Sequence, residues 1–235
     1  MTGDAYSMAS KALHESGRLF FGATGNTPVA SVTPFPYPDI MLPPWVVLVG
    51  GAHSECGAQE TMSGHPMELA ANFTQKLPSN TTTDESWWTA GTSFAAPAMA
   101  GTFGQALLGL RGSLGTGPHA GALWRGEPTP AGPLADGELS NEDLRAAFAL
   151  HARYFATTDY EPTAAMCLTA AQVGGVPGPV GPAPWQDQGW GYAGPAEAQA
   201  VVQWLAGNGD EPPAKPAAAE AWMAQVQAAR AVVKG

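Results

Sequence analysis

A helix built from small residues constrains this chain more than any other feature. The segment from Ser93 to Leu110 is rich in alanine and glycine through its first half. Such small side chains let neighbouring elements approach closely, so we expect a helix that is packed on all sides inside the domain. Pro97 is expected early enough in this helix for its missing N–H not to matter.

Apolar runs on either side of a proline-rich stretch predict the strands that this helix packs against. Residues 45–52 are almost continuously apolar, which is typical of a parallel strand buried on both faces. Residues 18–23 are expected to form another buried strand, and residues 68–73 are a short candidate strand. The polar residues 75–86 are expected to form an exposed loop. The order of these elements predicts an α/β domain with a parallel central sheet flanked by helices.

Helix signals are found before and after these strands. Apolar residues recur at helical spacing over residues 4–15, with Asp4 as the expected cap and Gly17 as the expected stop. A later helix is expected to begin after Ser140, with Asp143 completing a capping box in place of the usual Glu or Gln.

The character of the chain changes after Leu205. Residues 207–216 contain several prolines and glycines and are expected to form a linker. Residues 217–235 are alanine-rich, with Trp222 and Val226 on one helical face. We expect a terminal helix docked on the domain, and a helix that projects to a partner is the alternative.

Composition excludes some classes of partner. With 235 residues the chain can bury one full core, and its net charge of -10 argues against nucleic acid and against anionic membrane surfaces. No apolar run approaches the ~18 residues of a membrane span, and no signal peptide is visible at the first residues. Cys56 and Cys167 fit no metal motif, and either a disulfide or two free thiols would suit them.

Ser93 lies where a glycine-containing loop runs into the small-residue helix. A hydroxyl at this junction is exposed and sits at the positive end of the helix dipole, where developing negative charge is favoured. An ordinary helix cap at Thr92 or Ser93 is the simpler interpretation of such a serine.

The residues around Ser93 favour the catalytic interpretation. The string Gly91-Thr92-Ser93-Phe94-Ala95-Ala96-Pro97, followed by Ala100-Gly101, resembles the nucleophile motif of the subtilisin-like serine peptidases at every fixed position. The resemblance implies that Ser93 is the acyl-forming nucleophile, and that residues 1–206 are the C-terminal portion of a subtilisin-like, three-layer catalytic domain whose N-terminal part is missing.

Asn26 is the second residue that the resemblance singles out. The family has a strand ending in Ala-x-Gly-Asn, matched here by Ala23-Thr24-Gly25-Asn26, whose asparagine donates a hydrogen bond to the oxyanion. Read without the family, Gly25 and Asn26 would simply form a turn. The resemblance also implies substrate-binding roles for Gly25, Phe35 and Tyr37, although a surface loop with packed aromatics is the simpler interpretation of the last two.

A serine hydroxyl needs a base, and the base needs an orienting carboxylate. The family carries these in Asp-(Thr/Ser/Asp)-Gly and His-Gly-Thr strings, and neither string occurs in this chain. We therefore expect the catalytic Asp and His to lie outside it, in a missing N-terminal half. A truncated sequence, one half of a split enzyme, or an inactive scaffold or binding module would each explain this, and the first is preferred because both Ser93 and Asn26 are present.

The resemblance carries further expectations. It implies protein or peptide substrates, no required cofactor, and secretion. Calcium sites are frequent in the family, but their ligands cannot be assigned here, and no metal ligands are predicted. The isolated chain is expected to show no measurable proteolysis and to leave one edge of its sheet unpaired.

Overall fold

The computed structural model describes residues 2–26, 44–53, 57–58, 67–78, 86–113, 139–154, 188–207 and 209–232. Phe35, Tyr37, Cys56 and Cys167 lie outside these ranges, so the expectations for them stay predictions. The helices are α1 (Thr2–Glu15), α2 (Thr92–Ser113), α3 (Asn141–His151), α4 (Pro195–Leu205) and α5 (Ala217–Val232). The strands are β1 (Phe20–Ala23), β2 (Val46–His53), β3 (Gly57–Ala58), β4 (Leu69–Asn72), β5 (Thr74–Pro78) and β6 (Ser86–Ala90).

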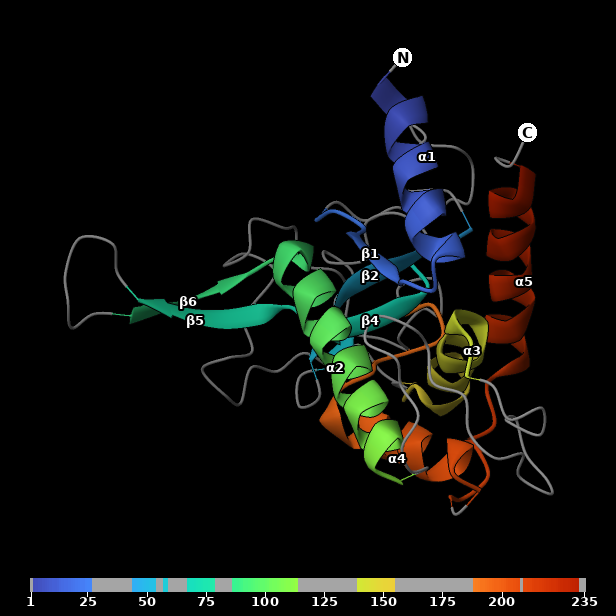
Figure 1. Cartoon of the computed structure of the whole chain (residues 1–235). Helices are drawn as coiled ribbons and strands as arrows, with labels where there is room; N and C mark the ends of the chain where they lie inside the picture. Colours follow the sequence, from blue (N-terminus) through green and yellow to red (C-terminus); the bar gives the residue numbers. More distant parts are fainter. Residues whose placement is uncertain are drawn as a thin grey trace.

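The chain folds as an α/β domain around a three-stranded parallel sheet packed against helices (Figure 1). Strand β2 lies in the centre, with β1 and β4 parallel to it on either side, and the short β3 pairs antiparallel with the end of β2. Among the described residues, β1 pairs with β2 alone. The parallel arrangement expected from the apolar runs is therefore confirmed.

Helix α2 covers one face of this sheet. Its buried residues Met99 and Phe103 join Val49 on β2 and Phe73 after β4 in the main hydrophobic core. Helices α3 and α4 extend the same core. Phe148 of α3 stacks on Phe103 with ring centroids 3.9 Å apart, and α4 contributes Val201 and Leu205. The sheet and these three helices thus share one apolar interior.

Two expectations for α2 are wrong. The helix is not packed on all sides, because Gly101 and Gly104 are exposed and Leu108 is 67% exposed. Pro97 lies in the second turn, since α2 already begins at Thr92. A residue at this position would normally donate its N–H to the carbonyl four residues earlier. The missing N–H of Pro97 therefore deprives the Ser93 carbonyl of its intrahelical partner.

The boundaries of α1 agree in part with the sequence. The helix begins at Thr2 rather than after Asp4, so Asp4 lies inside its first turn and the expected cap is wrong. Its end is confirmed: Gly17 has a φ of 79°, and the Arg18 N–H reaches back to the Leu13 carbonyl at 2.9 Å. A helix that ends in this way needs a residue with a positive φ just after its last turn. Glycine is favoured there because a positive φ strains other residues.

Helix α3 starts as the sequence predicts. The Ser140 hydroxyl accepts a hydrogen bond from the Asp143 N–H, and the Asp143 carboxylate accepts one from the Ser140 N–H at 2.8 Å. The capping box is therefore confirmed with Asp as the reciprocal residue.

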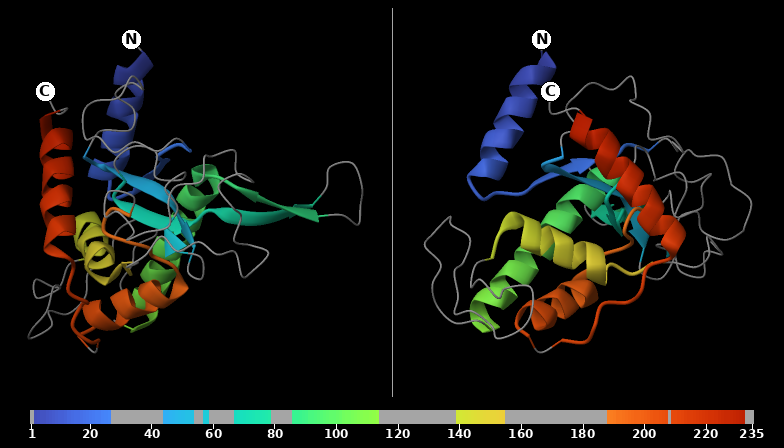
Figure 2. Two further views of the ribbon diagram at one scale, coloured as in Figure 1. Left: turned by 180° about the vertical axis from the view of Figure 1, so that it is seen from behind. Right: turned by 90° about the vertical axis from the view of Figure 1, so that its right-hand side faces the viewer.

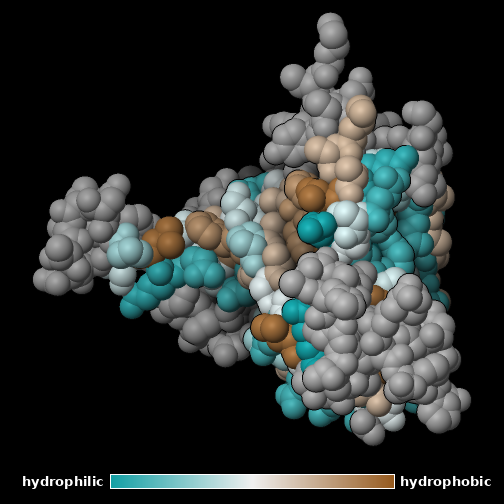
Figure 3. Space-filling view, in the orientation of Figure 1, coloured by the Kyte–Doolittle hydropathy of each residue, from teal (hydrophilic) through white to brown (hydrophobic). Residues whose placement is uncertain are grey.

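The segment after β4 differs from the expected loop. Strands β5 and β6 form an antiparallel hairpin, with Thr74 opposite Ala90 and Pro78 opposite Ser86. The hairpin projects from the body of the domain (Figures 1 and 3). The expectation of a loop over residues 75–86 is therefore wrong: Gln75–Pro78 and Ser86 belong to paired strands, although Gln75 and Lys76 are exposed.

The segment that precedes α4 returns to the sheet. Tyr192 forms a single parallel bridge to Ala70 of β4 and an antiparallel bridge to Arg153. Gly191 has a φ of 122°, and a side chain there would lie 2.6 Å from the Arg153 carbonyl oxygen. A glycine is therefore required for this close approach.

The terminal helix is docked, as expected. Helix α5 buries Met223 and Val226 against Trp190. It lies on the same side of the domain as α1, away from the hairpin (Figure 2). In the part of the chain that the structure describes, no helix combines the length and apolar character that crossing a membrane needs.

A buried ion pair joins α3 to the start of β4. The Arg145 guanidinium donates two hydrogen bonds to the Glu68 carboxylate, and the two side chains are 12% and 6% exposed. Burial alone would lower the pKa of Arg145, but the Glu68 charge more than offsets this and raises the pKa above its ordinary value. Arg145 also donates to the carbonyls of Pro44 and Val46, so it links α3 to the entry of β2 as well.

Replacing Arg145 by Met is predicted to destabilise the protein by about 3–5 kcal/mol, because the Glu68 carboxylate would stay buried without a partner. The double variant Arg145→Met/Glu68→Met should recover most of that loss, since it leaves no buried charge. Urea unfolding of the three proteins measures both effects. A double variant no more stable than the single one would contradict this explanation.

Candidate functional site

The residue pair predicted from sequence lies at the carboxyl edge of the parallel sheet. Strand β1 ends at Ala23, and Thr24 continues along β2 by donating its N–H and its hydroxyl to the Val49 carbonyl at 3.1 and 3.2 Å. Gly25 and Asn26 then turn away from the sheet towards the start of α2. Open parallel sheets form their sites at this edge.

Thr92 connects Asn26 to the start of α2. The Asn26 side-chain oxygen accepts hydrogen bonds from the Thr92 N–H at 2.9 Å and from the Thr92 hydroxyl at 3.0 Å. The same hydroxyl accepts a hydrogen bond from the Gly25 N–H at 3.1 Å. Thr92 is only 1% exposed, so these bonds are largely shielded from water. The structure therefore brings together Gly25, Asn26 and the residue before Ser93.

These contacts fix the orientation of the Asn26 amide. A backbone N–H can only donate, so the atom of Asn26 that faces Thr92 must be the oxygen. The Nδ2 amino group then points away from Thr92 and has no hydrogen-bond acceptor among the residues that the structure describes. Asn26 is itself exposed, so this group can be reached from solvent.

One backbone donor at the helix start is also available. The first amides of a helix have no intrahelical acceptor. The Thr92 N–H is satisfied by Asn26, and the Phe94 N–H reaches the Gly91 carbonyl at 2.9 Å. Within the described residues the Ser93 N–H has no hydrogen-bond acceptor outside its helix. The exposed Ser93 thus has its own N–H as a possible donor, and the Asn26 amide is held on the adjacent residue, Thr92.

The histidines whose side chains the structure describes lie elsewhere. His14 Nε2 is 3.5 Å from the Glu142 carboxylate, and the His151 ring packs on Trp204 with centroids 5.3 Å apart. Burial, followed by the charge of Lys215, lowers the pKa of His151. Neither histidine is hydrogen-bonded to Ser93, while the side chains of His53, His65 and His119 lie outside the described part of the chain.

Within the described ranges, no cluster of at least three His, Cys, Asp or Glu side chains could hold a metal ion. The contacts that join Gly25, Asn26 and Thr92 involve hydroxyl, side-chain amide and backbone groups.

Sequence reasoning missed the role of Thr92. It was considered only as a helix cap, although its N–H and its hydroxyl hold Asn26 in place. The recurring Thr beside the Ser in the nucleophile string was the available signal. Its contact with Asn26 joins residues 66 positions apart, so only the folded chain reveals the partner.

Comparisons with known proteins add no assignment. No protein-family model matches the chain, and a search among curated proteins finds no significant match.

Replacing Thr92 by Val is predicted to lower the free energy of unfolding by about 1–3 kcal/mol, because the Gly25 N–H loses its buried acceptor. Thr92→Ser keeps the hydroxyl and should cost clearly less. Urea unfolding compares the two variants, and the NMR signals of the Asn26 side-chain amide should shift in Thr92→Val alone. Equal stabilities and unchanged amide signals would contradict this role.

Proposed function

We propose that this chain carries the nucleophile and the oxyanion donors of a subtilisin-like serine endopeptidase. In this proposal the described α/β sheet and its helices are the C-terminal part of a three-layer subtilisin-like domain. The catalytic Asp and His come from a segment outside this chain. Protein or peptide chains are the substrates.

One observation carries the proposal: within the described residues the Asn26 amino group and the Ser93 N–H have no hydrogen-bond acceptor, and Thr92 holds Asn26 at the start of the helix that carries Ser93. The sequence string alone suggested a nucleophile and a separate strand-end asparagine. The Thr92 contacts hold that asparagine against the start of the same helix, with its oxygen on Thr92 and its amino group directed away from Thr92. In the proposal these two donors stabilise the oxyanion of a tetrahedral acyl intermediate.

The chemistry follows from these positions. The Ser93 Oγ attacks the carbonyl carbon of a peptide bond and forms an ester, while its proton passes to the external histidine. Negative charge develops on the former carbonyl oxygen, and the Ser93 N–H and Asn26 Nδ2 stabilise it together with the dipole of α2. The histidine then protonates the leaving amine. Water hydrolyses the ester by the same route in reverse and restores Ser93.

A scaffold or binding module without catalysis is the second candidate function. It is favoured by the positions of His14 and His151, which contact Glu142 and Trp204 rather than Ser93. The upstream reading frame distinguishes the two: Asp-Thr-Gly and His-Gly-Thr strings in frame support the peptidase. A stop codon with no partner gene would support the module.

A fluorophosphonate probe is predicted to label Ser93 in the full-length protein, because the external base activates its hydroxyl. Ser140 is the matched control, since it is also a serine at a helix start but its hydroxyl donates to the Asp143 carboxylate at 2.6 Å. Mass spectrometry of the labelled peptides locates the probe, and Ser93→Ala should abolish labelling whereas Ser140→Ala should not. The isolated chain should react at least ~10²-fold more slowly because it lacks the base. A folded full-length protein that the probe does not label would contradict the proposal.

Asn26→Leu is predicted to lower the kcat of the full-length enzyme by about 10² to 10³, the size known for such a donor in the family that the chain resembles. The KM should change little, because the lost bond is made mainly in the transition state. Peptide hydrolysis is measured alongside circular dichroism, with Thr92→Ser as the control that keeps Asn26 in place. An unchanged kcat would show that Asn26 does not stabilise the transition state, and it would leave the role of Ser93 untouched.

A further inference from the structure

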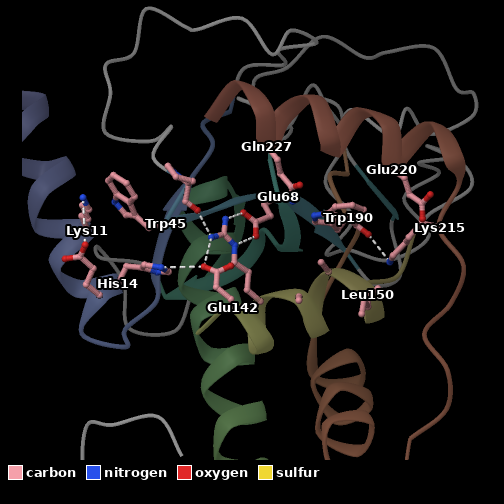
Figure 4. Close-up of a pocket in the computed structure, with 15 residues that line it drawn as sticks. Lys11, His14, Trp45, Glu68, Glu142, Leu150, Trp190, Lys215, Glu220 and Gln227 are labelled. Carbon is pink, nitrogen blue, oxygen red and sulfur yellow. Dashed lines mark hydrogen bonds and ion pairs between the residues drawn. The ribbon is translucent and has the colours of Figure 1, made fainter. Parts of the chain in front are cut away.

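A pocket of about 820 Å³ lies between α1, α3 and α5 (Figure 4). Its wall includes Trp45, which directly precedes β2, and Glu68, which directly precedes β4. This amino-end pocket therefore lies at the sheet edge opposite Ser93 and Asn26. Its volume is within the range of small-molecule sites.

In the middle of the amino-end pocket, the charged groups that the structure describes face one another. Arg145 is bound to the Glu68 carboxylate and to two backbone carbonyls. Glu142 faces both Arg145 at 3.9 Å and His14 at 3.5 Å. Arg145 and Glu68 thus satisfy one another, so they hold the elements together rather than await a ligand.

The end beside α1 is also occupied by its own partners. The Lys11 ammonium lies 3.8 Å from the Glu15 carboxylate and 5.9 Å from the centre of the Trp45 ring. Both side chains of the ion pair are more than half exposed. Water and Glu15 therefore already solvate the Lys11 charge.

The end beside α5 differs, because it holds a partly buried amine. Lys215 Nζ donates to the Ala152 carbonyl and, at 3.0 Å, to the Trp190 carbonyl. An ammonium has three donors, so in the described part of the chain one of them has no protein acceptor. Burial lowers the pKa of Lys215 to about 8, and the nearby Glu197 charge offsets only part of this effect. A ligand anion would supply the solvation that this ammonium has lost.

Apolar surface adjoins this amine. Trp190 is half-buried and Leu150 is 41% exposed, and both line the pocket beside Lys215 (Figure 4). Ala146 and Ala149 also line this pocket, and their small side chains leave room against α3. An apolar body can therefore lie between the indole and α3 while an anionic group reaches Nζ.

Other charged groups face Lys215 from three helices. Glu197 of α4 is engaged, since it accepts from the Gly194 N–H at 2.9 Å and lies 3.6 Å from Arg153. His151 of α3 has a lowered pKa and is neutral at pH 7. Glu220 of α5 is exposed and lines the pocket, so it opposes an anion there, although water screens its charge.

We propose that the Lys215 end of the amino-end pocket binds an aromatic carboxylate, with its ring between Trp190 and Leu150 and its carboxylate on Lys215 Nζ. This site is separate from the proposed peptidase centre and does not depend on it. No covalent step is involved.

A matched pair of probes tests the proposal on the full chain. The probes are 2-naphthoate and its uncharged analogue 2-naphthamide, measured by isothermal titration calorimetry at pH 7. The naphthoate should bind saturably and at least tenfold more tightly than the amide, because only the carboxylate pairs with Lys215. The proposal would be overturned if naphthoate and naphthamide bound the unmodified chain with equal affinity, or if the naphthoate showed no saturable binding.

Three variants locate the site. Lys215→Met should weaken naphthoate binding at least tenfold and leave naphthamide binding within twofold. Glu220→Gln should tighten naphthoate binding by about two- to threefold, because it removes the opposing charge. Lys11→Met, at the other end of the same pocket, should change neither affinity by more than twofold. Circular dichroism verifies that each variant is folded.

The pH dependence has a defined sign. Binding needs the charged form of Lys215, so naphthoate affinity should fall by about tenfold between pH 7 and pH 9 as the amine loses its proton. Naphthamide affinity should stay constant over the same range. A naphthoate affinity that is independent of pH, or that Lys215→Met leaves unchanged, would place the ligand elsewhere and refute the proposal.

Discussion

The packing of α2 across one face of the parallel sheet is the interaction on which the rest of this structure depends. Met99 and Phe103 bury against Val49 and Phe73, and each such side chain stabilises the fold by about 1.5–3 kcal/mol when fully buried. The Gly91 N–H also binds the Phe73 carbonyl at 3.0 Å, which anchors the start of α2 to the end of β4. Because this start is anchored, Thr92 at the beginning of α2 contacts Gly25 and Asn26 just after β1, while Ser93 stays exposed.

The polarity of the sheet then separates two kinds of chemistry. At the carboxyl edge the described residues leave donors without acceptors, on Asn26 and on the Ser93 N–H, as expected where a helix begins against strand ends. At the amino edge Arg145 and Glu68 form a buried ion pair. Lys215 differs from them, because backbone carbonyls rather than a carboxylate hold its ammonium.

Local signals in the sequence were reliable where the stabilising contacts are local. The end of α1 at Gly17 and the capping box of Ser140 involve residues a few positions apart, so their side chains alone predict them. The apolar run over residues 45–52 predicted β2 for a similar reason, since burial on both faces needs no polar alternation. The hairpin of β5 and β6 could not be predicted from its polar composition, because it is defined by hydrogen-bonded pairing between two segments that composition does not reveal.

The sequence by itself determined the α/β class, the parallel strands, and the choice of Ser93 and Asn26 as the residues of interest. Only the tertiary structure decided that Thr92 binds the Asn26 oxygen and so directs its amino group away, because that contact joins segments far apart in the chain. The exposed face of α2 and the partly buried Lys215 were likewise settled by packing. Small residues and a lone lysine fix neither burial nor hydration, which depend on the elements that fold against them.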